Sequence, residues 1–150
     1  MQLHLPTVLA ELERLDARLL VVSFAPVERL QRWVPFFTEQ LLARGYAERH
    51  LTLPDKPFAR TDFVANPTLD VYHAYGLGRY NPVGAFSLPV LGQYIRWGLQ
   101  GRPIGLAGDP LQRGGNFVVG RSGLLTLAHA GRNQGERPAP EAIIAALEQD

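Results

Sequence analysis

Residues 19–35 read LLVVSFAPVERLQRWVP, and this stretch determines the fold expected for the centre of the chain. Its first six residues are a continuous apolar run with β-branched valines, which is typical of a strand buried on both faces of a sheet. Pro26 suits the first turn of a helix, where its missing N–H has no cost. Apolar residues then follow at helical spacing, and the helix is expected to end near Gly45 with a kink at Pro35.

The segments on either side predict further helices and strands. Pro6 and Thr7 open a helix with leucines at positions 9, 12, 15 and 19. Residues 47–53 and 61–64 are compatible with strands, and Asn66-Pro67 opens a helix that Gly76 ends. A hairpin is expected at 116–119 and 124–129, and a last helix at 140–149. This order predicts an α/β fold with a central mixed sheet of about four to five strands and helices on both faces.

Composition limits the classes of function. The 150 residues suggest one domain, residues 1–150, with a net charge of +1 that gives no general attraction to nucleic acid. The absence of cysteine excludes disulfides and thiol chemistry. No uncharged apolar run reaches the roughly 20 residues of a membrane span, and the N-terminal stretch has no basic leader. These features predict a cytoplasmic protein.

The sequence predicts no metal site and no cofactor. The four histidines are His4, His50, His73 and His129, and no two of them have the spacing of a metal-binding motif. The glycine pairs Gly76-x-Gly78 and Gly114-Gly115 lack the context of a phosphate-binding loop. Helix capping and close strand packing account for them better.

Three stretches together resemble the peroxiredoxin-like proteins of the alkyl hydroperoxide reductase/thiol-specific antioxidant (AhpC/TSA) group, within the thioredoxin superfamily. They are LLVVSFAPVERLQRW from residue 19, ANPTLDVYHAYGLGR at 65–79 and GDPLQRGGNFVVGRSGLLTLAH at 108–129. The resemblance spans roughly residues 19–147 and implies a thioredoxin-like fold. The chain departs from the family before residue 19, where relatives carry extra strands and this chain has one predicted helix.

The resemblance also implies where a catalytic cysteine would lie. In active relatives it begins the helix after the buried strand, where the helix dipole stabilises a thiolate. That window falls here on Val27, Glu28, Arg29 and Leu30, and no residue from 23 to 33 is cysteine. We therefore expect a redox-inactive protein that is not a thiol enzyme.

A vacant cleft beside this window is a second expectation. Its candidate residues are Ser23, Pro26, Glu28, Arg113 and Asn116. They leave open a non-thiol enzyme, although Ser23 lacks a serine-hydrolase motif and is most simply a strand residue. They also leave open a small anionic ligand. Residues 71–135 contain six arginines and a single acidic residue. Scattered, solvated arginines are the simpler interpretation of this excess, and a patch that binds an anionic ligand, a lipid head group or an acidic partner is the alternative.

Residues 78–115 form an irregular insertion rich in glycine, proline and aromatic residues. Its candidate interface residues are Phe86, Leu91, Tyr94, Ile95 and Trp97, types that are common in interface hot spots. Core cover, a protein interface and a membrane-surface contact are the alternatives, and the low charge disfavours the last. The function predicted from the whole sequence is a protein-binding or assembly module, with self-association as one form of it.

Overall fold

The computed structural model describes residues 2–81, 92, 95, 96, 99, 109, 111–133 and 136–149. In this part of the chain the order of elements is η1 (Gln2–His4), α1 (Pro6–Arg14), β1 (Leu19–Ser23), α2 (Val27–Phe36), η2 (Phe37–Leu42), α3 (Ala43–Ala47), β2 (Thr61–Ala65), α4 (Asp70–Ala74), β3 (Gly115–Val119), β4 (Leu125–Ala130) and α7 (Pro140–Leu147). The alternation of helices and strands confirms the mixed α/β class.

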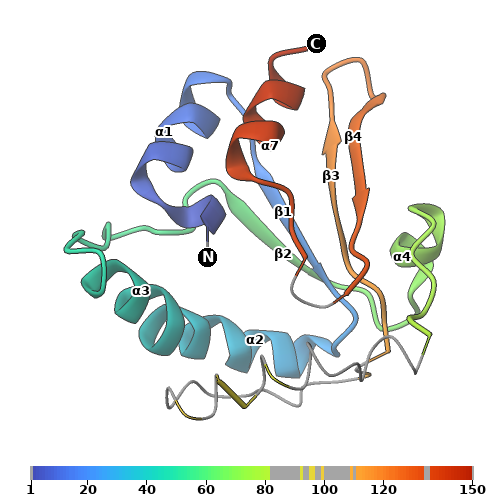
Figure 1. Cartoon of the computed structure of the whole chain (residues 1–150), viewed down its shortest axis with the longest axis horizontal. Helices are drawn as coiled ribbons and strands as arrows, with labels where there is room; N and C mark the ends of the chain where they lie inside the picture. The colour runs from blue at the N-terminus through green and yellow to red at the C-terminus, as the bar shows by residue number, and fades with distance from the viewer. Residues whose placement is uncertain are drawn as a thin grey trace.

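The strands form two small sheets where the sequence predicted one. β1 pairs with β2 in parallel, with Leu19 opposite Thr61. β3 pairs with β4 in antiparallel orientation, with Asn116 opposite His129. Figure 1 shows the β3–β4 hairpin beside β1, with β3 nearer to β1 and running in the opposite direction. The strands therefore lie in the spatial order β2, β1, β3, β4. No strand pairing joins β1 to β3 among the described residues.

The helix after β1 passes through Pro35 and ends at Ala47, two residues beyond the predicted end near Gly45. The helical path continues from Val27 through the π-helical turn η2 to Ala47, and Gly45 is buried inside α3 instead of ending the helix. Pro35 has no N–H to donate, and the wide π turn begins two residues after it. The Thr38 hydroxyl donates to the Val34 carbonyl at 2.8 Å, which satisfies one acceptor in the disturbed turn.

Two other predictions on this side of the fold are corrected. The stretch 47–53 forms no strand, because the helix extends into it and turns follow. β1 is not buried on both faces: Leu20 is 63% exposed. An apolar run predicts burial only if both neighbours in the sheet and both covering layers are present. Within the part of the chain that the structure describes, β1 has a strand partner on one side alone.

The remaining elements lie close to their predicted positions. β2 and the hairpin match the expected strands within a residue or two. α4 begins at Asp70, where the Asn66 side-chain oxygen accepts from the Val71 N–H at 3.0 Å, and Gly76 follows it with φ +68°. α7 packs on β3 and β4 through Ile143 and Ala146.

Each sheet has its own core cluster. Beside β2, the α2–α3 helix contributes Phe37, Leu42 and Tyr46, against which Trp33, Leu41, Leu53 and Phe58 pack. Beside β3, the cluster is aliphatic: Val118, Ile143 and Ala146, with Leu3, Leu127 and Leu147 around them. The two clusters share no residue, and the boundary between β1 and β3 lies between them.

Candidate functional site

The edge of β1 that faces β3 carries unpaired backbone groups. In a parallel pair, alternate residues direct their N–H and C=O groups to opposite sides. The Leu19 N–H donates to the Arg60 carbonyl at 2.8 Å, and the Ser23 carbonyl accepts from the Asn66 N–H at 2.6 Å. The odd-numbered residues of β1 therefore face β2, and the backbone groups of Leu20 and Val22 point toward β3.

The edge of β3 that faces β1 is open in the same way. The Gly131 N–H donates to the Gly114 carbonyl at 3.0 Å, so Gly114 and every second residue after it face β4. Gly115 and Phe117 consequently direct their backbone groups toward β1. Gly115 also permits the close approach of β4, because a Cβ there would lie 2.8 Å from the His129 carbonyl oxygen.

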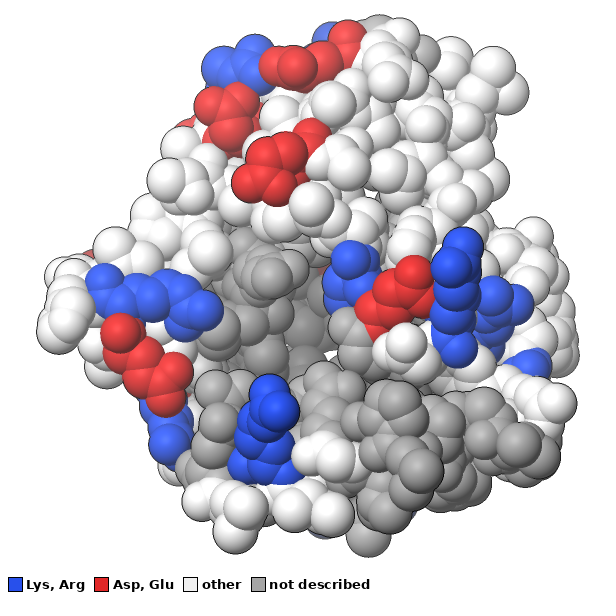
Figure 2. Space-filling model, viewed as in Figure 1, with Lys and Arg blue, Asp and Glu red and all other residues white. Residues whose placement is uncertain are grey.

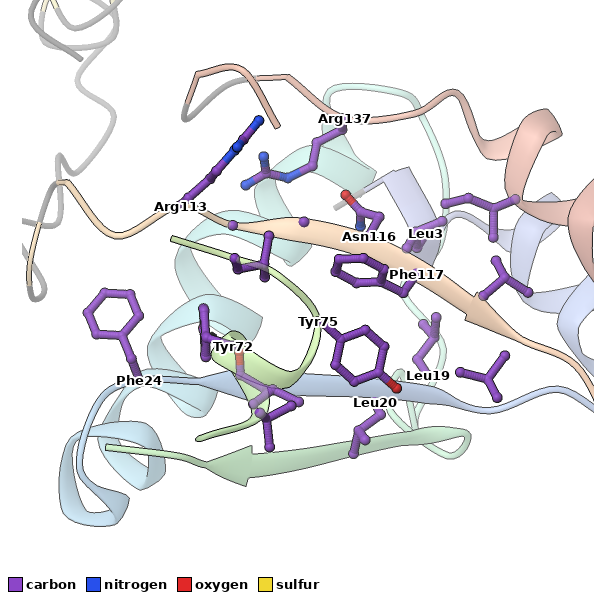
Figure 3. A pocket seen from close by; sticks show the side chains of 18 of the residues that line it. Leu3, Leu19, Leu20, Phe24, Tyr72, Tyr75, Arg113, Asn116, Phe117 and Arg137 are labelled. Carbon is purple, nitrogen blue, oxygen red and sulfur yellow. Dashed lines mark hydrogen bonds between the residues drawn. The ribbon is translucent and has the colours of Figure 1, made fainter. Parts of the chain in front are cut away.

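A cleft of about 790 Å³ lies between these two open edges. We call it the β1–β3 cleft. Its walls are mainly apolar and come from β1, β3, η1, α1, α7 and the end of α4. Figure 3 shows Leu19 and Leu20 from β1, Phe117 from β3 and the rings of Tyr72 and Tyr75 around it. This is the combination of a concave apolar body and a few polar groups that small-ligand sites usually have.

Two tyrosines from the α4 region contact the strands on either side of the cleft, Tyr72 on the β1 side and Tyr75 on the β3 side. The Tyr72 hydroxyl donates to the Val22 carbonyl at 2.9 Å, in a position where a neighbouring strand would bond. Burial raises the pKa of Tyr72, and a backbone hydrogen bond from Phe24 acts in the opposite direction. The Tyr75 ring packs on Phe117, with 4.7 Å between the ring centroids. Tyr72 thus substitutes for one strand-pairing position, and Leu20 keeps an open one.

Four charged side chains line the β1–β3 cleft: Arg18, Asp109, Arg113 and Arg137. Arg18 pairs with Asp62 at 2.9 Å, and Asp109 pairs with Arg79 at 2.7 Å. The other two arginines bond to backbone carbonyls, Arg113 to Gly131 at 2.8 Å and Arg137 to Glu136 at 2.6 Å. Neither is paired with a carboxylate within the described parts of the chain.

A buried polar atom without a partner belongs to Asn116, which lines the cleft. The side-chain oxygen of Asn116 and the Nε2 atom of His129 are both buried and have no hydrogen-bond partner within the described residues. The two residues are directly opposite each other in the β3–β4 register. Unsatisfied buried polar atoms are uncommon in native proteins, so the Asn116 side chain is a candidate contact for a molecule bound in the cleft.

The structure divides the residues predicted for the vacant cleft into two groups. Arg113 and Asn116 line the β1–β3 cleft, whereas Ser23, Pro26 and Glu28 do not. The Ser23 hydroxyl accepts from the Ala25 N–H at 3.1 Å, which stabilises the turn after β1. Pro26 precedes the first residue of α2, and Glu28 is exposed in its first turn.

The window that holds the cysteine in the resembling family has no substitute nucleophile. Val27, Glu28 and Arg29 are exposed at the start of α2, and Leu30 is buried. The nearest hydroxyl, that of Ser23, is engaged in its own turn.

The residues of the cleft that the sequence did not predict include Tyr72, Tyr75 and Arg137. The tyrosines were assigned to a helix in the second resembling stretch, and their spacing of three residues was the available signal that both share a face. Arg137 lies in the loop between β4 and α7. Only the return of that loop beside β3 brings it to the cleft, and no local pattern predicts such a return.

Most of the predicted interface lies outside the described residues, including Phe86, Leu91, Tyr94 and Trp97. Ile95 is described and is 57% exposed. The two ends of the insertion are joined, because Arg79 and Gln112 form an antiparallel bridge and the Tyr80 N–H donates to the Leu111 carbonyl at 2.7 Å.

In Figure 2, acidic side chains are interleaved with basic ones on the face shown.

Within the described residues, no group of three or more His, Asp or Glu side chains is placed to hold a metal ion. None of the helices searched there has both the length and the apolar composition needed to cross a membrane. Comparisons of the chain with protein-family models, with curated proteins and with solved structures find no match.

Proposed function

We propose that this chain is a redox-inactive, thioredoxin-like domain that binds a mainly apolar ligand in the β1–β3 cleft. The observation that carries the proposal is the cleft itself, which lies between two facing strand edges that are not paired with each other. The thioredoxin-like part is supported by the order of elements and by the position of the hairpin beside β1 (Figure 1). The redox-inactive part is supported by a sequence without cysteine.

An apolar ligand fits the walls of the cleft. Side chains from six elements, among them Leu12, Phe117 and Ile143, present hydrocarbon and ring surface to the same space. Burying apolar surface contributes roughly 25 cal/mol for each Å² removed from water. A ligand that fills this space would therefore gain most of its affinity from contact with these walls.

A neutral fluorescent dye tests this proposal without requiring a charge on the ligand. We expect N-phenyl-1-naphthylamine to bind the purified chain with a blue-shifted, enhanced emission. Leu19→Trp replaces an aliphatic side chain of the cleft with a larger indole ring and should weaken dye binding about tenfold or more. Leu124→Trp adds the same ring at a position that is 71% exposed and outside the cleft, and should leave binding unchanged. Failure of the folded parent chain to bind the dye would reject the proposal.

Protein binding through the insertion is a second candidate function. The observation that favours it is the exposure of two aliphatic side chains, Ile95 at 57% and Leu99 at 85%. We take a second copy of the chain as the partner, and light scattering after size-exclusion chromatography measures it. Ile95→Ser/Leu99→Ser should convert a dimer to a monomer, while Val27→Ser, on another exposed apolar side chain, should not. A monomeric parent chain would reject this second function.

A further inference from the structure

We infer that the ligand of the β1–β3 cleft is a monocarboxylate with an apolar body, and that Arg113 and Arg137 bind its carboxylate. The inference rests on the proposed function and adds the chemical class of the ligand. Both arginines lie at the end of the cleft where Asn116 projects from β3 (Figure 3).

Charge balance selects an anion. Of the four charged groups that line the cleft, Arg18 and Asp109 have partners of opposite charge outside its lining, at 2.9 Å and 2.7 Å. Arg113 and Arg137 have none within the described residues. The unpaired charge of the cleft is therefore positive and is concentrated at one end of an otherwise apolar space.

The guanidinium groups are held in place and still have donors to offer. Arg113 uses its Nε for the Gly131 carbonyl at 2.8 Å and one terminal nitrogen for the Ala130 carbonyl at 3.4 Å. Arg137 uses one terminal nitrogen for the Glu136 carbonyl at 2.6 Å. A guanidinium carries five N–H donors, so most of them remain for a ligand. The fork of donors matches the two oxygens of a carboxylate.

Asn116 supplies a third polar contact beside the arginines. It lines the cleft, and its side-chain oxygen is buried and has no hydrogen-bond partner within the described residues. A half turn of the amide presents its NH₂ group to a carboxylate oxygen. A bound carboxylate would thus remove an unsatisfied polar group as well as neutralise the arginines.

The remaining walls of the cleft limit the ligand to one charged group. They include the aliphatic residues Leu3, Leu12, Ile143 and Leu147, which come from η1, α1 and α7, and the charge of Arg18 is already paired with Asp62. The Phe117 and Tyr75 rings form one wall. A second charge on the ligand would lose its hydration among these side chains without a partner.

Displacement of the neutral dye by matched compounds tests the inference. We expect decanoate to displace N-phenyl-1-naphthylamine at a concentration about tenfold or more below that needed for decan-1-ol, since a carboxylate gains charge-assisted hydrogen bonds. Arg137→Gln and Arg113→Gln should each reduce this preference several-fold while dye binding persists. Arg29→Gln removes an exposed arginine of α2 that is outside the cleft, and should leave the preference intact.

The outcomes separate the inference from the proposed function. If the dye binds but decanoate and decan-1-ol displace it equally, the carboxylate assignment is wrong and the cleft remains a site for apolar ligands. If the preference survives both arginine substitutions, the carboxylate binds elsewhere. Arg113→Gln removes two bonds to the β4 end, so circular dichroism must show a folded variant. Arg137→Gln changes an exposed side chain and provides the test even if Arg113→Gln does not fold.

Discussion

The two halves of this molecule are built from different side chains. We define the β1–β2 half as β1, β2 and the α2–α3 helix, and the β3–β4 half as the hairpin with α7. Rings dominate the first: Trp33 stacks on Phe37 at 4.7 Å between centroids, and Phe58 contacts Phe63 at 5.2 Å. Aliphatic residues dominate the second, with Val118, Ile143 and Ala146 at its centre.

This difference shows why a cleft can lie in the middle of so small a chain. Each half satisfies its own strand pairing and fills its own core cluster. Side chains from the α4 region contact both halves: Tyr72 bonds to the Val22 carbonyl of β1, and Tyr75 packs on Phe117 of β3. The two halves can therefore be tested separately, and so can the bridge between them.

The largest effect is expected from removing an aromatic ring in the β1–β2 half. Phe37→Ala deletes a ring that contacts Trp33, Phe58 and His4 and should lower the free energy of unfolding by about 3–5 kcal/mol. Urea denaturation measures the loss. Amide hydrogen exchange should show that protection falls first in β1, β2 and the α2–α3 helix.

Ile143→Ala is the counterpart in the β3–β4 half. It should cost about 2–5 kcal/mol and lower amide protection first in β3, β4 and α7. If either substitution lowers protection equally in both halves, the chain unfolds as one unit and the comparison between halves fails.

The second prediction joins the two open edges by a disulfide. Leu19 and Val118 belong to different strands and both line the β1–β3 cleft. Leu19→Cys/Val118→Cys should form a disulfide on oxidation, raise the free energy of unfolding by about 2–4 kcal/mol and abolish dye binding. Reduction should restore binding.

A chain without native cysteine makes the control simple. Leu19→Cys/Leu124→Cys places the second thiol at the exposed hairpin turn, outside the cleft, and should stay reduced. Dye binding that persists in the cross-linked Leu19→Cys/Val118→Cys chain would show that the dye does not enter between the strands.

Local patterns predicted the elements better than their assembly. The β-branched run at Leu19 and the turn at Gly120-Arg121-Ser122-Gly123 lie in short stretches, and the structure has a strand and a turn there. The helix expected from Asn66-Pro67 begins a few residues later, at Asp70. Gly45 marks the end of its helix only approximately, because it is buried inside α3 and the helix continues to Ala47.

The site needed information that no local pattern contains. Arg113 and Asn116 were found because they lie in one resembling stretch, whereas Arg137 comes from the loop after β4. Whether β1 pairs on one side or both depends on the distance between two sheets whose residues are almost a hundred positions apart. Ser23 was predicted to line the candidate cleft because it precedes the vacant window in sequence, but its hydroxyl accepts a hydrogen bond from the Ala25 N–H in the turn after β1.

The third prediction concerns acid and the docking of the N-terminal segment onto the β1–β2 half. His4 is 6% exposed between Phe37 and Phe58, and burial lowers its pKa to about 4. Because the folded-state pKa lies below the ordinary value of 6.5, the neutral form favours folding. Stability should be complete above about pH 6.5 and fall by at most about 3 kcal/mol as the pH drops to about 4. Urea denaturation at pH 7.5 and 4.5 measures this.

His4→Leu separates this contribution from that of the carboxylates. The variant should lose less stability than the parent chain over the same pH interval. His50→Leu, at an exposed position, should follow the parent chain. If His4→Leu and the parent lose stability equally, His4 is not the group that couples folding to acid.

The smallest effect is expected at the bridge, where Tyr72→Phe keeps the ring and removes the hydroxyl. The Val22 carbonyl would lose its 2.9 Å partner on the open edge, which should cost about 1 kcal/mol in urea denaturation. Tyr75→Phe is the matched control, because Tyr75 contacts Phe117 through its ring and should tolerate the change. The size of the loss reports the state of the cleft. A cost near zero would mean that water already reaches the β1 edge, whereas a cost of about 2–3 kcal/mol would mean that the edge is dry and that an apolar ligand enters without displacing water from it.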